Sequence, residues 1–171
     1  MTQLELKEKL YDLVCEHFAL LKKRGNIIWG RSKAVYPGSP LVVIYMTNIQ
    51  RPFLPTREYI NGIINDNYPI STILSVDLVS HGEPVTDEPN IASQNKNTAV
   101  SELLDFANFI NSVYVDNWCN INNISLRVRA VQDLTAIIND NAWQYRALLE
   151  IDVGFIQTAS GYTAHDNKSP K

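Results

Sequence analysis

The sequence predicts an α+β fold, in which two helices pack on one face of a mainly antiparallel sheet that ends in a long C-terminal β-hairpin. Apolar residues recur at intervals of three and four in residues 3–23 and 97–115, which is the spacing of an amphipathic helix. They alternate with polar residues in residues 124–130 and 142–157, which is the spacing of a half-buried strand. The order helix, strand, strand, helix, strand, strand favours helices gathered on one side of an antiparallel sheet.

Length and composition agree with one globular domain. The chain has 171 residues, 45% hydrophobic and 19% charged, and a domain typically has roughly 100 to 200 residues. We assign residues 1–157 to a single domain and residues 158–171, which lack periodicity, to a polar C-terminal tail. The formal net charge of −3 gives the chain no electrostatic reason to bind nucleic acid or an anionic membrane. The N-terminal residues lack a secretory signal pattern, so we expect folding in a cytoplasm.

The first helix, residues 3–23, has a signal at each end. Thr2 and Glu5 have the spacing of a capping box, in which two side chains satisfy two free backbone N–H groups. Three cations at residues 22–24 suit the negative end of a helix, and Gly25 suits its C-terminal cap. We interpret these cations as a helix-end cluster rather than a nucleic-acid patch.

Two strands and two irregular segments follow. A β-branched apolar run predicts a buried strand at residues 41–47, and alternation predicts a half-buried strand at residues 70–79. Between them, residues 50–69 hold three prolines, and we expect an irregular excursion or lid. Residues 81–98 are polar and contain proline, so we expect a mobile loop that orders only against a neighbour.

The second helix, residues 97–115, has a narrow apolar stripe, with Thr98 as its N-cap candidate. A polar face opposite that stripe indicates that this helix lies on one side of a sheet.

The last two strands can be aligned by charge. An antiparallel register puts three pairs of opposite charge on one face: Arg127 with Asp152, Arg129 with Glu150, and Asp133 with Arg146. The same register puts four apolar pairs on the other face: Ile124 with Phe155, Leu126 with Val153, Val128 with Ile151, and Ala130 with Leu149. A register in which the strands slide past each other would oppose Arg129 to Arg146, and like charges directly opposite are unfavourable. We therefore predict the charge-matched register and a strand long enough to project past the core.

The sequence offers little catalytic chemistry. It contains no metalloprotease, nucleophile-elbow or glycine-rich phosphate-binding motif. Cys15 and His17 are two residues apart on a helix and point about 200° apart, so they cannot form a nucleophile pair. We expect Cys15 and Cys119 to be reduced, partly buried apolar residues. We therefore expect a protein that is not an enzyme, with no cofactor and no metal.

An acidic region leaves one catalytic alternative open. Four carboxylates lie in or near the loop of residues 81–98: Asp77, Glu83, Asp87 and Glu88. They could bind a divalent ion, although they lack the regular spacing and glycine of a calcium loop. A solvated loop is the simpler interpretation.

Candidate interface residues form two groups. Five aromatic residues occupy segments that we expect to be irregular: Trp29, Tyr36, Phe53, Tyr59 and Trp118. Five charged residues share a face of the C-terminal strands: Arg127, Arg129, Arg146, Glu150 and Asp152. Large aromatic side chains often anchor partners, and exposed strands can pair with a neighbour, so we expect assembly. The alternatives are aromatics that close over their own core and a charged face that is paired internally.

The C-terminal third resembles a known family. Residues 124–135 read ISLRVRAVQDLT, and residues 143–155 read WQYRALLEIDVGF. This sequence is similar to the end of tailed-bacteriophage neck or tail terminator proteins, where a strand ends near Asp-Leu-Thr and an aromatic-x-x-Arg-Ala element begins a long last strand. The earlier helix, strand, strand and helix agree with that family in order. Residues 50–69 and 81–98 are longer than in a minimal member.

The resemblance implies a tail-terminator-like fold and a structural protein of the virion. Such a protein forms a ring of six copies on the head-proximal end of the tail tube, where it stops tube polymerisation and joins the head connector. Its partners would be further copies of itself, the tail tube protein, the head-side connector or stopper protein and, in tails that have one, the sheath. It would be assembled in the cytoplasm of the bacterial host, bind no membrane and no cofactor, and pass genomic DNA through its lumen without reading sequence.

Two other functions stay open at this stage. The chain could be another head–tail joining component, such as a stopper or a tail completion protein, with the same fold and a different docking face. It could also be a small metal-dependent enzyme that uses the acidic loop.

Overall fold

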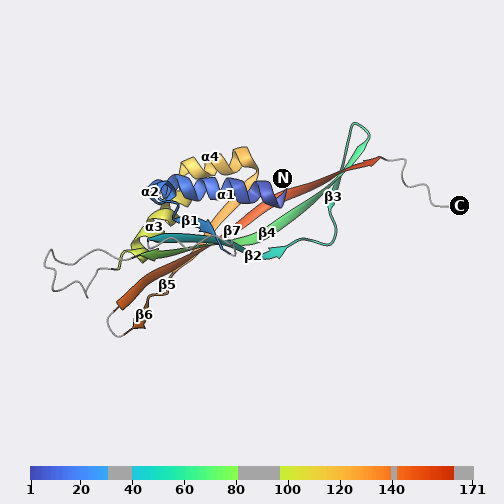
Figure 1. Ribbon diagram of the computed structural model, residues 1–171. Coiled ribbons are helices and arrows are strands. Elements are labelled where there is room, and N and C mark those ends of the chain that lie inside the picture. Colours follow the sequence, from blue (N-terminus) through green and yellow to red (C-terminus); the bar gives the residue numbers. More distant parts are fainter. Residues whose placement is uncertain (31–39, 81–96, 140–141, 164–171) are drawn as a thin grey trace.

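The computed structural model describes residues 1–30, 40–80, 97–139 and 142–163. In these parts of the chain, seven strands form one mixed, mainly antiparallel sheet, and four helices lie on one side of it (Figure 1). The predicted α+β class and antiparallel sheet are confirmed, whereas the described helices number four rather than two. None of them is both long and apolar enough to cross a membrane.

The first predicted helix is present but divided. It forms α1 (Gln3–His17) and α2 (Ala19–Lys23), because Phe18 leaves helical geometry with φ −92° and ψ 45°. The capping box is confirmed: the Glu5 N–H donates to Thr2 Oγ1 at 3.2 Å, and the Thr2 N–H donates to the Glu5 carboxylate at 2.7 Å. Gly25 follows the helix with φ +72°, a conformation that glycine adopts without strain.

The second predicted helix is wrong in its extent. Residues 99–110 form α3 (Ala99–Ile110), and α4 (Val113–Asn122) follows after a break. Ser112 causes the break, because its side chain accepts the Val115 N–H at 3.3 Å and caps the new helix. Thr98 makes no side-chain cap bond; instead the Ala99 N–H donates to Asn97 Oδ1 at 3.1 Å.

The sheet has strand order β1-β2-β4-β7-β5, with β3 beside β4 and β6 beside β7. The strands are β1 (Ile27–Trp29), β2 (Leu41–Gln50), β3 (Thr56–Ile60), β4 (Ile63–Ser80), β5 (Ile124–Asp133), β6 (Ala136–Asn139) and β7 (Ala142–Thr163). Among the described strand pairs, the short pair β1–β2 is parallel and the others are antiparallel. The predicted loop at 81–98 lies almost entirely outside the described residues, and so do residues 164–171 of the predicted tail.

The predicted excursion at residues 50–69 is mostly a β-hairpin. β3 and the start of β4 pair antiparallel around Asn61 and Gly62, whose φ angles are +51° and +78°. Positive φ at both central residues is the geometry of a tight hairpin turn, and Asn-Gly is its preferred sequence. The end of β7 pairs alongside, so residues 158–163 of the predicted tail belong to a strand.

We call residues 51–67 together with 158–163 the arm. Figure 1 shows it projecting beyond the helices, as expected for so long a last strand. Of the described strands, only β4 and β7 run through residues 68–69 and 156–157, because β2 and β5 end before this point and β3 begins after it. We call this two-stranded section the waist. Pro69 lies in it, where a missing backbone N–H removes no ladder bond to β2 or β3.

The predicted C-terminal register is correct over half its length. Ile124 to Val128 pair with Phe155 to Ile151 as predicted, including Arg127 with Asp152. A bulge between Val128 and Ala130 then shifts the register by one residue. The predicted pairs Arg129–Glu150, Ala130–Leu149 and Asp133–Arg146 are therefore wrong. Val131 takes the half-buried place opposite Leu149, and Ala130 is exposed.

The core lies between the helices and one face of the sheet. Its fully buried members include Ile44, Leu74, Leu78, Leu149 and Ile151 from the sheet, and Leu6, Leu10, Leu103 and Phe106 from the helices. The even-numbered residues of the predicted strand 70–79 face this core as expected. Ser75 and Asp77, on the other face, are also buried, because β4 is central and larger side chains flank it.

We expect Phe106→Ala to lower the free energy of unfolding by about 3–5 kcal/mol, because it opens a cavity beneath α3. Leu104→Ala is the control, since Leu104 is 50% exposed on the same helix, and we expect it to cost less than about 1 kcal/mol. Urea denaturation followed by circular dichroism measures both. Equal losses would contradict the orientation of α3.

Candidate functional site

The sheet face opposite the helices carries a partly buried ion pair between its two central strands. The Arg146 Nε donates to Asp77 Oδ1 at 2.9 Å and to Oδ2 at 3.1 Å, and Nη2 donates to Oδ2. The Asp77 side chain is only 6% exposed, against 44% for Arg146. The hydrogen bonds with Asp77 raise the pKa of Arg146. Because a buried carboxylate is unfavourable without such bonds, this pair holds β4 and β7 in register.

A second ion pair lies nearer the sheet edge. The Arg129 Nε and Nη2 each lie 2.8 Å from Asp152 Oδ1, and both side chains are over 40% exposed. The hydrogen bond with Asp152 raises the pKa of Arg129. Arg129 was predicted to lie opposite Glu150, but the bulge turns it toward Asp152 instead.

Two residues of the predicted charged face form no ion pair with another described residue. Arg127 and Glu150 form no ion pair with another described residue, although Arg127 is exposed and lies opposite Asp152 in the ladder. The alternative of an internally paired face therefore holds for Arg129, Arg146 and Asp152. Arg127 and Glu150 are therefore the predicted interface residues on this face whose charges form no ion pair with another described residue, and Arg127 is the more exposed of the two.

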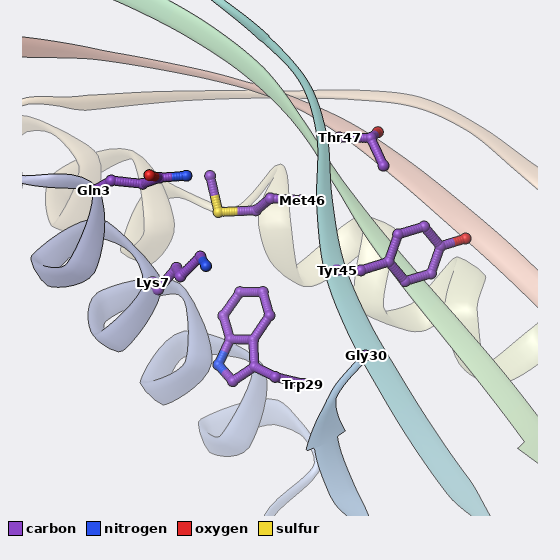
Figure 2. A pocket seen from close by; sticks show the side chains of 7 residues that line it. All are labelled: Gln3, Lys7, Trp29, Gly30, Tyr45, Met46 and Thr47. Atoms are coloured by element: carbon purple, nitrogen blue, oxygen red, sulfur yellow. The ribbon is translucent and has the colours of Figure 1, made fainter. Parts of the chain in front are cut away.

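A cleft lies between α1 and the β1–β2 edge of the sheet. It has a volume of about 640 Å³ and is lined by Gln3, Lys7, Trp29, Gly30, Tyr45, Met46 and Thr47. Figure 2 shows Gln3, Lys7, Trp29 and Met46 gathered on one side of β2, whereas Tyr45 and Thr47 point to its other side. Lys7 Nζ lies 5.8 Å from the centre of the Trp29 ring, within cation–π range. Among the described lining residues Lys7 is the one that carries a charge, so these residues offer no acid–base pair.

The predicted aromatic anchors divide into three groups. Phe53 and Tyr59 are 96% and 67% exposed on the arm, as an anchor for a partner requires. Trp29 and Trp118 are half-buried and pack against the core. The expectation that these aromatics occupy irregular segments is wrong for Trp29 in β1, Tyr59 in β3 and Trp118 in α4. Tyr36 lies outside the described residues.

His17 and Cys15, the two residues that could have formed a catalytic pair, are packed among apolar side chains. His17 packs against Phe18, Phe106 and Phe109, with ring centres 4.8, 5.0 and 5.1 Å away. Burial lowers the pKa of this imidazole. It also raises the pKa of the Cys15 thiol, which opposes formation of a reactive thiolate.

The described residues contain no cluster of three metal-ligating side chains. Of the four carboxylates in the acidic region, Asp77 is engaged by Arg146. The other three, Glu83, Asp87 and Glu88, lie outside the described residues. The metal-site alternative therefore loses Asp77 as a free ligand.

Comparisons with known proteins add no family to this description. No protein-family model matches the chain, and no curated protein matches it. The function has to be inferred from the geometry of the molecule and from the resemblance of its C-terminal strands. The features available for that inference are the ion-paired sheet face, the cleft beside α1 and the exposed arm.

The partly buried ion pair between Arg146 and Asp77 gives a stability prediction. We expect Arg146→Gln to lower the free energy of unfolding by about 1–3 kcal/mol, because it leaves the Asp77 carboxylate buried without its charged donor. The double variant Asp77→Asn with Arg146→Gln should recover part of that loss, since an amide carries no charge to desolvate. Arg127→Gln is the control on the same face. A similar loss in the control, by urea denaturation, would contradict a special role for the pair.

The surroundings of His17 give a pH prediction. The folded-state pKa lies below the ordinary value of 6.5, so the neutral imidazole favours the folded state. Its contribution is fully present above pH 6.5 and is lost as the pH falls below that value. We expect the free energy of unfolding to fall as the pH is lowered from above to below 6.5, and to fall more steeply for the wild type than for His17→Gln. The other two histidines are present in both proteins, so parallel curves would refute this assignment.

Proposed function

We propose that this chain is a structural virion protein of a tailed phage, a neck or tail terminator protein. In this proposal, copies of the chain form a ring on the head-proximal end of the tail tube and join it to the head connector. The ring would contact the tube protein on one side and the head-side connector or stopper protein on the other. Arg127 and the exposed aromatics Phe53 and Tyr59 are the candidate contact residues.

One observation supports the proposal most. The two sequence elements that carry the resemblance, Asp-Leu-Thr at the end of β5 and aromatic-x-x-Arg-Ala at the start of β7, meet in the fold. The Leu134 N–H donates to the Arg146 carbonyl at 2.8 Å, and the Thr135 N–H donates to Asp133 Oδ1 at 2.9 Å. Arg146 also holds Asp77, and Ala147 is fully buried. The elements therefore form one structural unit that ends β5 and starts the long strand.

The shape of the molecule supports assembly in a ring. A ring requires each copy to contact its neighbours through two different surfaces, and extended edges or projections suit such contacts. The arm projects from the body, and every residue of β3 is exposed. The net charge of −3 also suits a channel for DNA, because a negatively charged lumen does not bind the passing phosphates.

Deleting the gene from the phage tests this function. We expect tails of uncontrolled length by electron microscopy, because nothing would stop polymerisation of the tube. Expression of the wild-type chain from a plasmid is the control and should restore normal length. Tails of normal length that fail to join heads would contradict the terminator role and favour a stopper or completion protein.

A further inference from the structure

The arm exposes an unusual amount of apolar surface for so small a part of the molecule. Its large apolar side chains are highly exposed: Phe53 96%, Leu54 74%, Tyr59 67%, Ile60 52% and Ile63 44%. Together they expose roughly 600 Å², if a large apolar side chain has about 170 to 220 Å² of accessible surface. Because successive residues of a strand point to opposite faces, Tyr59 lies on one face of the arm, and Ile60 and Ile63, which pair across the hairpin, lie on the other. An exposed apolar area of this size usually marks a contact with another molecule.

A second exposed apolar surface of similar size lies on the helices. We define the helix patch by five residues of α1, α2 and α4: Leu4 66%, Leu20 73%, Val113 75%, Tyr114 52% and Ile121 80% exposed. These residues also expose roughly 600 Å² by the same measure. Lys9 bonds to Asn122 and Glu16 accepts from Tyr114, so α1 and α4 lie side by side in opposite directions. The patch therefore spans α1 and α4, which are hydrogen-bonded to each other, and extends onto α2.

The two surfaces cannot cover each other within one molecule. Figure 1 shows the arm leaving the body beyond the N-terminal end of α1 and pointing away from the helices. The ladder between β4 and β7 continues to the end of the arm, from Ser80 and Tyr145 to Ile63 and Thr163. Folding the arm back onto the helices would break that ladder.

We propose that the arm of one copy docks on the helix patch of a second copy. The two apolar areas are similar in size. Docking that encloses both faces of the arm brings each area, together with a polar rim, close to the roughly 800 Å² per partner of a standard stable interface. Because the contact joins two different surfaces, each docked copy leaves one arm and one helix patch free for the next copy. The inference rests on the proposed function for the closure of this series into a ring.

Two double variants test the contact by complementation. The arm variant carries Phe53→Ser and Tyr59→Thr, and the helix variant carries Val113→Gln and Ile121→Gln. All four side chains are exposed, so both variants should fold, which circular dichroism checks. Native mass spectrometry and light scattering give the mass of each protein and of their equimolar mixture.

We expect the wild type to associate and each variant alone to be monomeric, with association weakened at least roughly 30-fold. The mixture should form a heterodimer and nothing larger, because only one intact arm and one intact helix patch remain per pair. Leu104→Gln, an exposed position on α3 outside the patch, is the matched control and should leave the mass unchanged.

Three outcomes would overturn the docking proposal. The mixture could fail to restore association, the helix variant could still associate through its arm, or the wild type could stay monomeric both alone and with tail tube protein. A ring with another contact would leave the proposed function intact, because the tail-length experiment tests that function separately. Conversely, heterodimers together with normal tails in the deleted phage would uphold the contact and reject the terminator role.

Discussion

The antiparallel pairing of β4 with β7 is the interaction on which the rest of the structure depends. It runs from the body of the protein to the end of the arm, and every other strand except β1 attaches directly to one of these two. A slip by one residue would turn the buried side chains of both strands to the opposite face. The register is held on one side by the core and on the other by Arg146 and Asp77. The same ladder therefore fixes the helix-facing core and the direction of the arm.

Features set by local sequence could be predicted. The capping box at Thr2, the cap at Gly25 and the alternation in β5 and β7 each depend on residues close together in the chain. The helix α4 was missed because asparagines and β-branched residues give residues 113–122 little intrinsic helix propensity, so packing stabilises it instead. The hairpin at Asn61 and Gly62 has a local turn signal, but the three prolines at positions 52, 55 and 69 favour an irregular segment over paired strands.

The ion pairs of the sheet face opposite the helices were predicted less well than the local features, because they depend on which strands are neighbours in the sheet. The charges of β5 and β7 can be matched from the sequence because these long strands lie close together in the chain, whereas the partner of Arg146 lies on β4, far away in the sequence. The bulge at Arg129 inserts one residue without disturbing the alternating pattern before it, so no periodicity reveals it. Arg127 opposite Asp152 was placed correctly, since it lies on the near side of that bulge.

The waist determines how the molecule responds to force. The sheet is two strands wide at the waist, between a wider body and a three-stranded arm. Fewer paired strands resist bending at the waist than in the body or the arm. Pro69 occupies this section, and one bond from the Met1 amino group to the Ile156 carbonyl braces it. Strain placed on the arm would therefore concentrate at residues 68–69 and 156–157. The arm would act as a lever that pivots there while the hydrophobic core keeps its shape.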